Sequence, residues 1–209
     1  MMTAIFKKQD AMTLTELLIS SILVGVVITG AMSADFAVRT WQKRIEHRTM
    51  AQMDLARALE QITKDVKSVI GRGAESYAAP SLPFTRAIHY RSDSANKIFQ
   101  LCLRQDPDIT VAGDEYYVVY EYPNWAIAAR ICRYEWPAQD MSSPKTNYDG
   151  SLLAVPDQAE FFKINLDGTT LESIEITLTT RPDPSQSVDP QKNPAFSLTT
   201  TLMPTGISQ

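Results

Sequence analysis

The sequence predicts an α+β protein in which a long N-terminal helix, half membrane-spanning and half amphipathic, packs on a mostly antiparallel β-sheet domain. Three observations support this fold class. An uncharged apolar run covers Leu17–Ala34, no glycine or proline lies between Gly30 and Gly71, and all twelve prolines lie at or after Pro80. Glycine and proline are the strongest local breakers of helices, so their distribution separates a helical half from a half with frequent turns.

The apolar run predicts a transmembrane helix over residues 12–36. Its eighteen residues contain no charge and follow Lys7 and Lys8. As a helix they extend about 27 Å, close to the hydrocarbon thickness of about 30 Å. A buried core helix is the alternative interpretation. Core helices normally show an apolar stripe, however, whereas this run is apolar on every face.

The helix is expected to continue to about Ile70, with residues 37–70 forming its amphipathic half. Apolar residues recur there at steps of four and three, which places them on one helical face. We expect this stripe to pack against the protein's own sheet, with a coiled-coil seam as the alternative. The stripe consists of Leu55, Leu59, Ile62, Val66 and Val69.

Residues 80–209 are expected to supply the β-rich part of a globular domain covering residues 37–209. The segments rich in β-branched and aromatic residues predict seven strands. The pairs Asp149-Gly150 and Asp167-Gly168 are interpreted as turns between strands, and residues 181–194, with four prolines, as a loop. The expected strands are Ala87–Arg91, Lys97–Arg104, Glu115–Tyr122, Trp125–Tyr134, Glu160–Asn165, Ser173–Thr180 and Phe196–Leu202.

Composition argues against several classes of function. The net charge of −4 does not indicate nucleic acid as a partner. Two histidines and two cysteines offer little for a zinc site or a histidine-based catalytic centre, so we expect no cofactor, no metal and no enzyme activity. A cluster of acidic residues could in principle bind calcium, but no twelve-residue calcium loop is present, and solvated carboxylates are the preferred interpretation. These residues are Asp106, Asp108, Asp114 and Glu115.

The two cysteines, Cys102 and Cys132, lie in expected strands thirty residues apart. In an oxidising compartment a disulfide between them would stabilise the fold by about 3–4 kcal/mol. The alternative is a pair of buried thiols that pack as small apolar groups. The spacing fits neither a redox motif nor a zinc knuckle.

The segment KKQDA-MTLTELLIS, from Lys7 to Ser20, resembles the prepilin signal of type IV pilins and type II secretion pseudopilins. In that family a short basic leader ends in a small residue, and a glutamate occupies the fifth position of the mature chain. The resemblance implies a leader of residues 1–11 ending at Ala11, an N-methylated first residue Met12, and Glu16 as the fifth. The family usually has glycine where Ala11 stands and phenylalanine where Met12 stands.

Physical reasoning also gives Glu16 a special place. A carboxylate carried to the bilayer centre costs about 2–3 kcal/mol or more, so it needs a partner. Cleavage after Ala11 would create an amine on Met12, one helical turn from Glu16. The same carboxylate could pair with the amine of a neighbouring subunit and set the axial register of a filament. The alternative is an interfacial glutamate that interacts with the helix dipole.

The length and β-rich second half resemble a minor pilin or a J-type minor pseudopilin. The resemblance implies prepilin peptidase and other major and minor pilin-like subunits as partners. It also implies a single pass through the inner membrane, with the N-terminus cytoplasmic and the C-terminal domain periplasmic, before entry into a pilus or pseudopilus. One alternative is a signal-anchored envelope binding protein that does not polymerise. Another is a secreted domain, released by cleavage near Ala31 or Ser33.

Charge around the apolar run conflicts with this orientation. Four cations, Arg39, Lys43, Arg44 and Arg48, follow the run, whereas only Lys7 and Lys8 precede it. Positive residues normally flank the cytoplasmic end of a span. We follow the resemblance for the orientation, although the charge distribution conflicts with it.

Overall fold

The chain forms one long helix and nine strands in a computed structural model. The structure describes residues 13–71, 73–77, 86–96, 98–106, 115–122, 130–137, 146–154, 160–168, 170–183, 187, 189–191 and 193–203. The chain divides into two compact units, residues 1–46 and residues 47–209. The expected boundary after residue 36 lies within the first unit.

Helix α1 (Leu14–Lys67) is continuous through 54 residues, close to the predicted extent of residues 12–70. No proline occurs in it, and its two glycines, Gly25 and Gly30, are tolerated at a modest cost in helix propensity. Burial along α1 begins at Ala51, and every described residue before it is exposed or, at Arg48, half-buried. The long helix on a mostly antiparallel β-domain is therefore confirmed.

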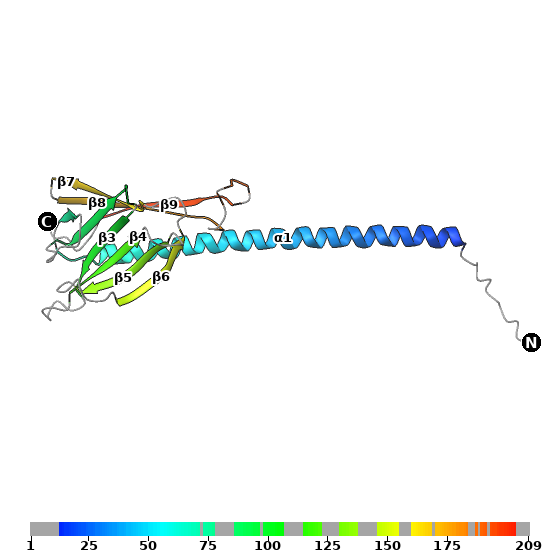
Figure 1. Ribbon diagram of the computed structural model, residues 1–209, viewed down its shortest axis with the longest axis horizontal. Coiled ribbons are helices and arrows are strands. Elements are labelled where there is room, and N and C mark those ends of the chain that lie inside the picture. Colours follow the sequence, from blue (N-terminus) through cyan, green and yellow to red (C-terminus); the bar gives the residue numbers. More distant parts are fainter. Residues whose placement is uncertain are drawn as a thin grey trace, which may run out of the picture. The chain divides into compact units, whose positions relative to one another are not determined.

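Six strands form the larger sheet, in the order β1-β2-β3-β4-β5-β6. All neighbours in it are antiparallel except β1 and β2, which are parallel. Figure 1 labels strands of this sheet along the green to yellow part of the chain. The strands are β1 (Ala74–Ser76), β2 (Ile88–Asp93), β3 (Ile98–Gln105), β4 (Tyr116–Tyr122), β5 (Arg130–Pro137) and β6 (Thr146–Ala154).

The smaller sheet is antiparallel, in the order β7-β8-β9. Its strands are β7 (Phe162–Asp167), β8 (Thr170–Thr180) and β9 (Phe196–Leu202). Gly168, with φ of 60°, lies between β7 and β8 at the predicted turn, because glycine adopts this left-handed backbone conformation without strain. The described residues between β8 and β9 form no named strand, in agreement with the expected loop.

Two strands were not predicted. Strand β1 has only three residues, which carry no recognisable pattern. Strand β6 contains Asp149-Gly150, so the prediction of a turn at this pair is wrong. Register shifts interrupt the pairing of β5 with β6 on both sides of Arg133, which lies opposite Asp149. An irregular ladder accommodates turn-forming residues within a strand.

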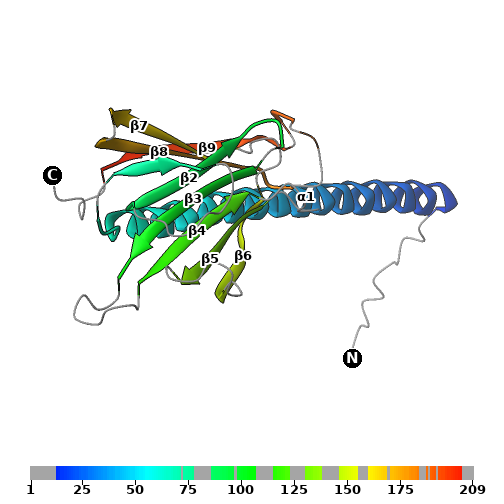
Figure 2. The ribbon, with the colours of Figure 1, turned by 60° about the vertical axis from the view of Figure 1, so that its left-hand side comes forward.

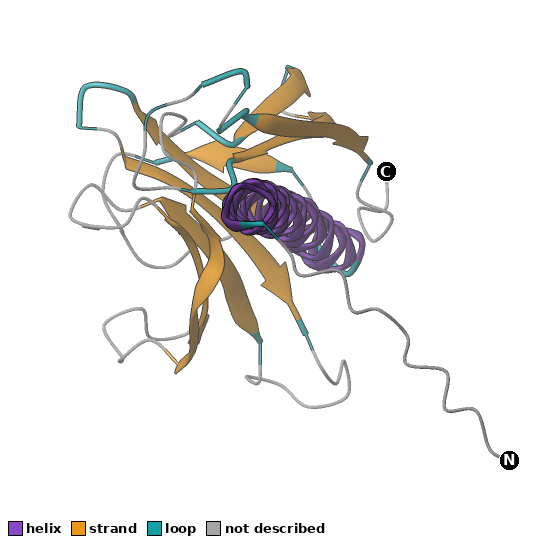
Figure 3. Cartoon of the chain, turned by 90° about the vertical axis from the view of Figure 1, so that its right-hand side faces the viewer, coloured by secondary structure: helices purple, strands orange, loops and turns teal. Residues whose placement is uncertain are grey.

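The main hydrophobic core of the second unit lies between the C-terminal part of α1 and both sheets. Apolar side chains of the helix, of β2 to β5 and of β7 to β9 form one contiguous cluster. Figures 2 and 3 show strands of both sheets beside this part of the helix. The expected stripe is largely confirmed: Leu55, Ile62, Val66 and Val69 are buried, and Leu59 is partly buried.

Candidate functional site

The first turn of α1 places Glu16 in a reciprocal hydrogen-bonded cap. Thr13 precedes the helix, and its Oγ1 accepts a hydrogen bond of 3.3 Å from the Glu16 backbone N–H. The Glu16 carboxylate accepts bonds of 2.9 Å from the Thr13 backbone N–H and from Thr13 Oγ1. This capping box satisfies two backbone donors that the helix itself leaves unpaired.

The capping role of Thr13 was not foreseen, although the spacing Thr-x-x-Glu from Thr13 to Glu16 is the sequence signal for it. Both of these bonds to the carboxylate use one oxygen, Oε2. The side chain of Glu16 is exposed, and its position at the third residue of the helix puts a negative charge at the positive end of the helix dipole. Ala11 and Met12, the expected cleavage and methylation positions, lie outside the described residues.

The first unit presents an apolar helix with every described side chain exposed. Its large hydrophobic residues are at least half exposed, a pattern that a water-soluble unit does not tolerate over so large a surface. The helix is long and apolar enough to cross a membrane. The exposed residues from Leu17 to Ile28 are Leu17, Leu18, Ile19, Ile22, Leu23, Val24, Val26, Val27 and Ile28.

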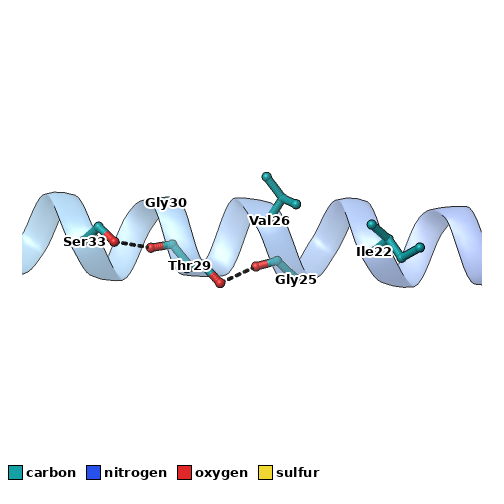
Figure 4. Close-up of a pocket in the computed structure, with 6 residues that line it drawn as sticks. All are labelled: Ile22, Gly25, Val26, Thr29, Gly30 and Ser33. Atoms are coloured by element: carbon teal, nitrogen blue, oxygen red, sulfur yellow. Dashed lines mark hydrogen bonds between the residues drawn. The ribbon is translucent and has the colours of Figure 1, made fainter.

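A shallow groove runs along one face of this apolar helix, where small residues follow one another at helical spacing (Figure 4). It is lined by Ile22, Gly25, Val26, Thr29, Gly30 and Ser33. Apart from the adjacent backbone of the helix itself, a Cβ atom added at Gly25 or Gly30 would meet no atom within 4 Å, so the groove is open. Small residues of this kind let the backbone of another helix approach closely.

The hydroxyl groups in the groove are already satisfied within the helix. Thr29 Oγ1 donates to the Gly25 carbonyl at 2.8 Å, and Ser33 Oγ donates to the Thr29 carbonyl at 2.8 Å (Figure 4). Hydroxyl groups in a lipid environment need such partners, because no water is available to them. The groove is therefore chemically suited to an apolar surrounding despite its polar side chains.

A buried polar cluster fixes α1 to the larger sheet in the second unit. Asp65, only 5% exposed, lies on the buried face of the helix. Its carboxylate accepts bonds from Arg133 Nε at 2.9 Å and from the Tyr120 hydroxyl at 2.5 Å, and Gln61 also bonds to it. Burial, followed by the charge of Asp65, raises the pKa of Tyr120, so its hydroxyl remains a donor.

The disulfide expected between Cys102 and Cys132 is not formed. The cysteines are buried thiols on β3 and β5, and β4 lies between these two strands. Two strand spacings amount to about 9–10 Å, beyond the Cα separation of about 4.4–6.8 Å that a disulfide needs. The pairing Cys102–Val119 and Cys132–Glu121 fixes this separation, which the sequence interval of thirty residues did not reveal.

The outer face of the larger sheet carries a second cluster around Cys102. Tyr117, Val119, Tyr134 and Trp136 pack with Cys102 on this face, opposite the main core. His89, the cross-strand neighbour of Cys102, accepts a 3.1 Å bond from the Arg86 backbone N–H through Nε2. Burial, and then the charges of Arg86 and Arg104, lower the pKa of His89 to about 4. This neutral, enclosed imidazole is a packing group.

Two of the four acidic residues considered for calcium, Asp106 and Glu115, belong to the described part of the chain. Glu115 pairs with Arg104, and Asp106 is half-buried after β3. Asp108 and Asp114 lie outside the described residues. Among the residues that the structure describes, no group of three or more histidine, cysteine or acidic side chains could hold a metal ion.

Comparison with known proteins gives no identification. No family model, no curated protein and no solved structure matches the chain. The functional conclusion therefore depends on the chemistry of the chain itself.

Proposed function

We propose that the chain is a minor pilin or minor pseudopilin, a non-enzymatic subunit that takes part in assembling or priming a type IV pilus or a type II secretion pseudopilus. Prepilin peptidase would remove residues 1–11, and Met12 would be N-methylated. The helix of the first unit would be held in the inner membrane until it enters an assembly with other pilin-like subunits. The second unit would be the periplasmic domain.

The observation that carries this proposal is the position of Glu16. Its carboxylate lies in the first turn of a helix whose apolar surface is exposed throughout the first unit. Transfer of this charge into the bilayer costs about 2–3 kcal/mol or more, so a cationic partner from another subunit would be strongly favoured. The resemblance of residues 7–20 to a prepilin signal supplies that partner as the new amine of Met12.

The N-terminal mass of the protein isolated from its own cells tests processing. Loss of residues 1–11 with the gain of one methyl group supports the proposal. A full-length chain would instead favour a signal-anchored envelope binding protein, which the same exposed helix also supports. Cleavage near Ala31 or Ser33 would contradict both functions.

The capping box allows the two roles of Glu16 to be separated. Glu16→Gln keeps a side chain that can complete the box but removes the charge, whereas Thr13→Ala removes the cap and keeps the charge. We expect Glu16→Gln to be cleaved normally and to be lost from filaments or complexes with other subunits. Thr13→Ala should still enter them, since loss of a cap costs only about 1 kcal/mol.

The measurement is the fraction of tagged subunit that cross-links to other subunits in cells. If Glu16 serves only the helix cap, Thr13→Ala will lower this fraction and Glu16→Gln will not. That outcome would reject the assembly role of the carboxylate.

A further inference from the structure

The cations that follow the apolar run have the geometry of a membrane-surface contact. Arg39, Lys43 and Arg44, named here the collar, are all exposed on α1. A helix rises about 1.5 Å per residue, so they lie about 8–15 Å beyond Ala34, the end of the uncharged run. Side chains on a helix lean towards its N-terminus, which directs the collar back towards the run. Long cationic side chains can therefore reach a headgroup layer there.

The neighbours of the collar fit the same surrounding. Phe36 is 74% exposed and Trp41 is 67% exposed, and no contact in the described part of the first unit covers them. Aromatic side chains at the end of a span are typical of the interface between lipid and water. Val38 and Ile45, also exposed, supply apolar surface on the helical face of Trp41.

Charge favours an anionic partner for this segment. Asp35, its one acidic residue, is paired with Arg39 at 2.8 Å, so Lys43 and Arg44 keep their charge available. Residues 35–45 thus have a net charge of +2, from three cations and one carboxylate. Residues 47–209 have a net charge of −5, from 15 cations and 20 carboxylates. Arg48 differs from the collar, because it is half-buried and donates to the Gln191 carbonyl at 2.8 Å.

We propose that the segment Asp35–Ile45 begins in the headgroup layer and that the collar, whose side chains reach back towards this layer, binds anionic phospholipids. This gives a role to the cations that conflict with the usual charge distribution around a span. The inference needs the apolar run to be in a membrane, but it rests neither on filament assembly nor on the orientation of the span. Each cation near an anionic surface can contribute a factor of up to about five in lipid affinity.

Quenching of Trp41 by brominated lipids tests this proposal. The full chain carries Trp125→Phe and Trp136→Phe, so that Trp41 is its single tryptophan, and is reconstituted in vesicles of phosphatidylcholine with a minor share of phosphatidylglycerol. Bromine is placed on one lipid or the other. The ratio of quenching, corrected for the share of each lipid, gives the enrichment of phosphatidylglycerol around Trp41.

We expect an enrichment of about two- to fivefold. It should fall to about one in the triple variant R39Q/K43Q/R44Q, and also in about 1 M NaCl, where the screening length is only about 3 Å. The matched control R57Q/K64Q/K163Q removes three exposed cations from the second unit and should keep the enrichment.

Three outcomes would overturn the proposal. Absence of quenching by either lipid would show that Trp41 lies away from the bilayer. Equal enrichment in the parent and in R39Q/K43Q/R44Q would show that the collar does not select lipid. If R39Q/K43Q/R44Q kept the enrichment but showed weaker cross-linking between copies of the chain, the collar would bind a protein partner instead.

Discussion

Asp65 illustrates how a single charged residue can belong to an apolar interface. It lies among the buried residues of α1, where the sequence indicated only the apolar stripe. Its partner Arg133 is 68 residues away in the sequence and reaches it from β5. Periodicity cannot reveal such a residue, because a charge within a stripe is read as part of the solvated face unless its partner is known.

Among the residues that form ion pairs, replacement of Asp65 should lower the free energy of unfolding most. Asp65→Asn removes the charge that compensates Arg133 and leaves Glu135, at 3.3 Å, as the remaining carboxylate partner. We expect a loss of about 2–3 kcal/mol in the free energy of unfolding, somewhat below the usual cost of breaking a buried pair. Chemical denaturation of the full chain in detergent measures it.

Asp93→Asn is the matched control, since its pair with Arg91 is more exposed. It should cost less than about 1 kcal/mol. Equal losses for the two variants would show that Asp65 has no special structural role.

His89 should make stability depend on pH. Its pKa is about 4 in the folded chain and returns to its ordinary value of 6.5 on unfolding. Between these values the unfolded chain takes up a proton that the folded chain does not. As far as His89 is concerned, the free energy of unfolding therefore has its full value above pH 6.5. It decreases by at most about 3 kcal/mol as the pH falls to about 4.

Thermal unfolding from pH 4 to pH 7.5 checks this dependence. His89→Gln should flatten the curve in that window, because a neutral amide replaces the titrating group. His47→Gln, at an exposed position, should leave the curve unchanged. If His89→Gln and the parent chain showed the same slope of thermal stability against pH, the pH dependence would belong to the carboxylates.

At the scale of elements, the strongest patterns were predicted best. Strand β9 has the predicted bounds, and α1 differs from its prediction by only a few residues at each end. Strand β6 was missed because Asp149-Gly150 has the local preference of a turn, which pairing with β5 overrides. The absence of the disulfide likewise depended on strand order, which places β4 between the two cysteines and which no local pattern contains.

The groove on α1 predicts a substitution that affects association but not folding. Gly25→Leu meets open space in the isolated chain and improves helix propensity by about 1 kcal/mol. If another helix packs in the groove in the proposed assembly, the added bulk should lower cross-linking between subunits about tenfold. Helix content from circular dichroism should be retained.

Val24→Leu is the control, because it adds bulk on the face of the helix opposite the groove-lining residues. A similar loss of cross-linking in both variants would show that the groove has no special part in association.

At the scale of the whole molecule, burial divides the chain unequally. All residues of both hydrophobic clusters lie at or after Leu55, within the second unit. The first unit supplies exposed apolar surface and gains little from folding in water. The average composition of the chain, which resembles that of a soluble protein, combines these two different parts.

A chain that begins at His47 should therefore fold without the first unit. It retains every residue of the two clusters and the cluster around Asp65. We expect its free energy of unfolding to equal that of the full chain within about 1 kcal/mol, the cost of an uncapped helix start. Loss of cooperative unfolding in this shorter chain would show that the first unit contributes to the core.

The internal hydrogen bonds of Thr29 and Ser33 have a consequence for how subunits would recognise one another. With these donors occupied, the groove discriminates mainly by the volume and contour of what enters it. Contacts of that kind are indifferent to ionic strength, whereas an attraction between Glu16 and a cation is weakened by it. Dissociation by salt would consequently report on charged contacts such as that of Glu16, and a salt-resistant remainder would measure how closely the surfaces fit.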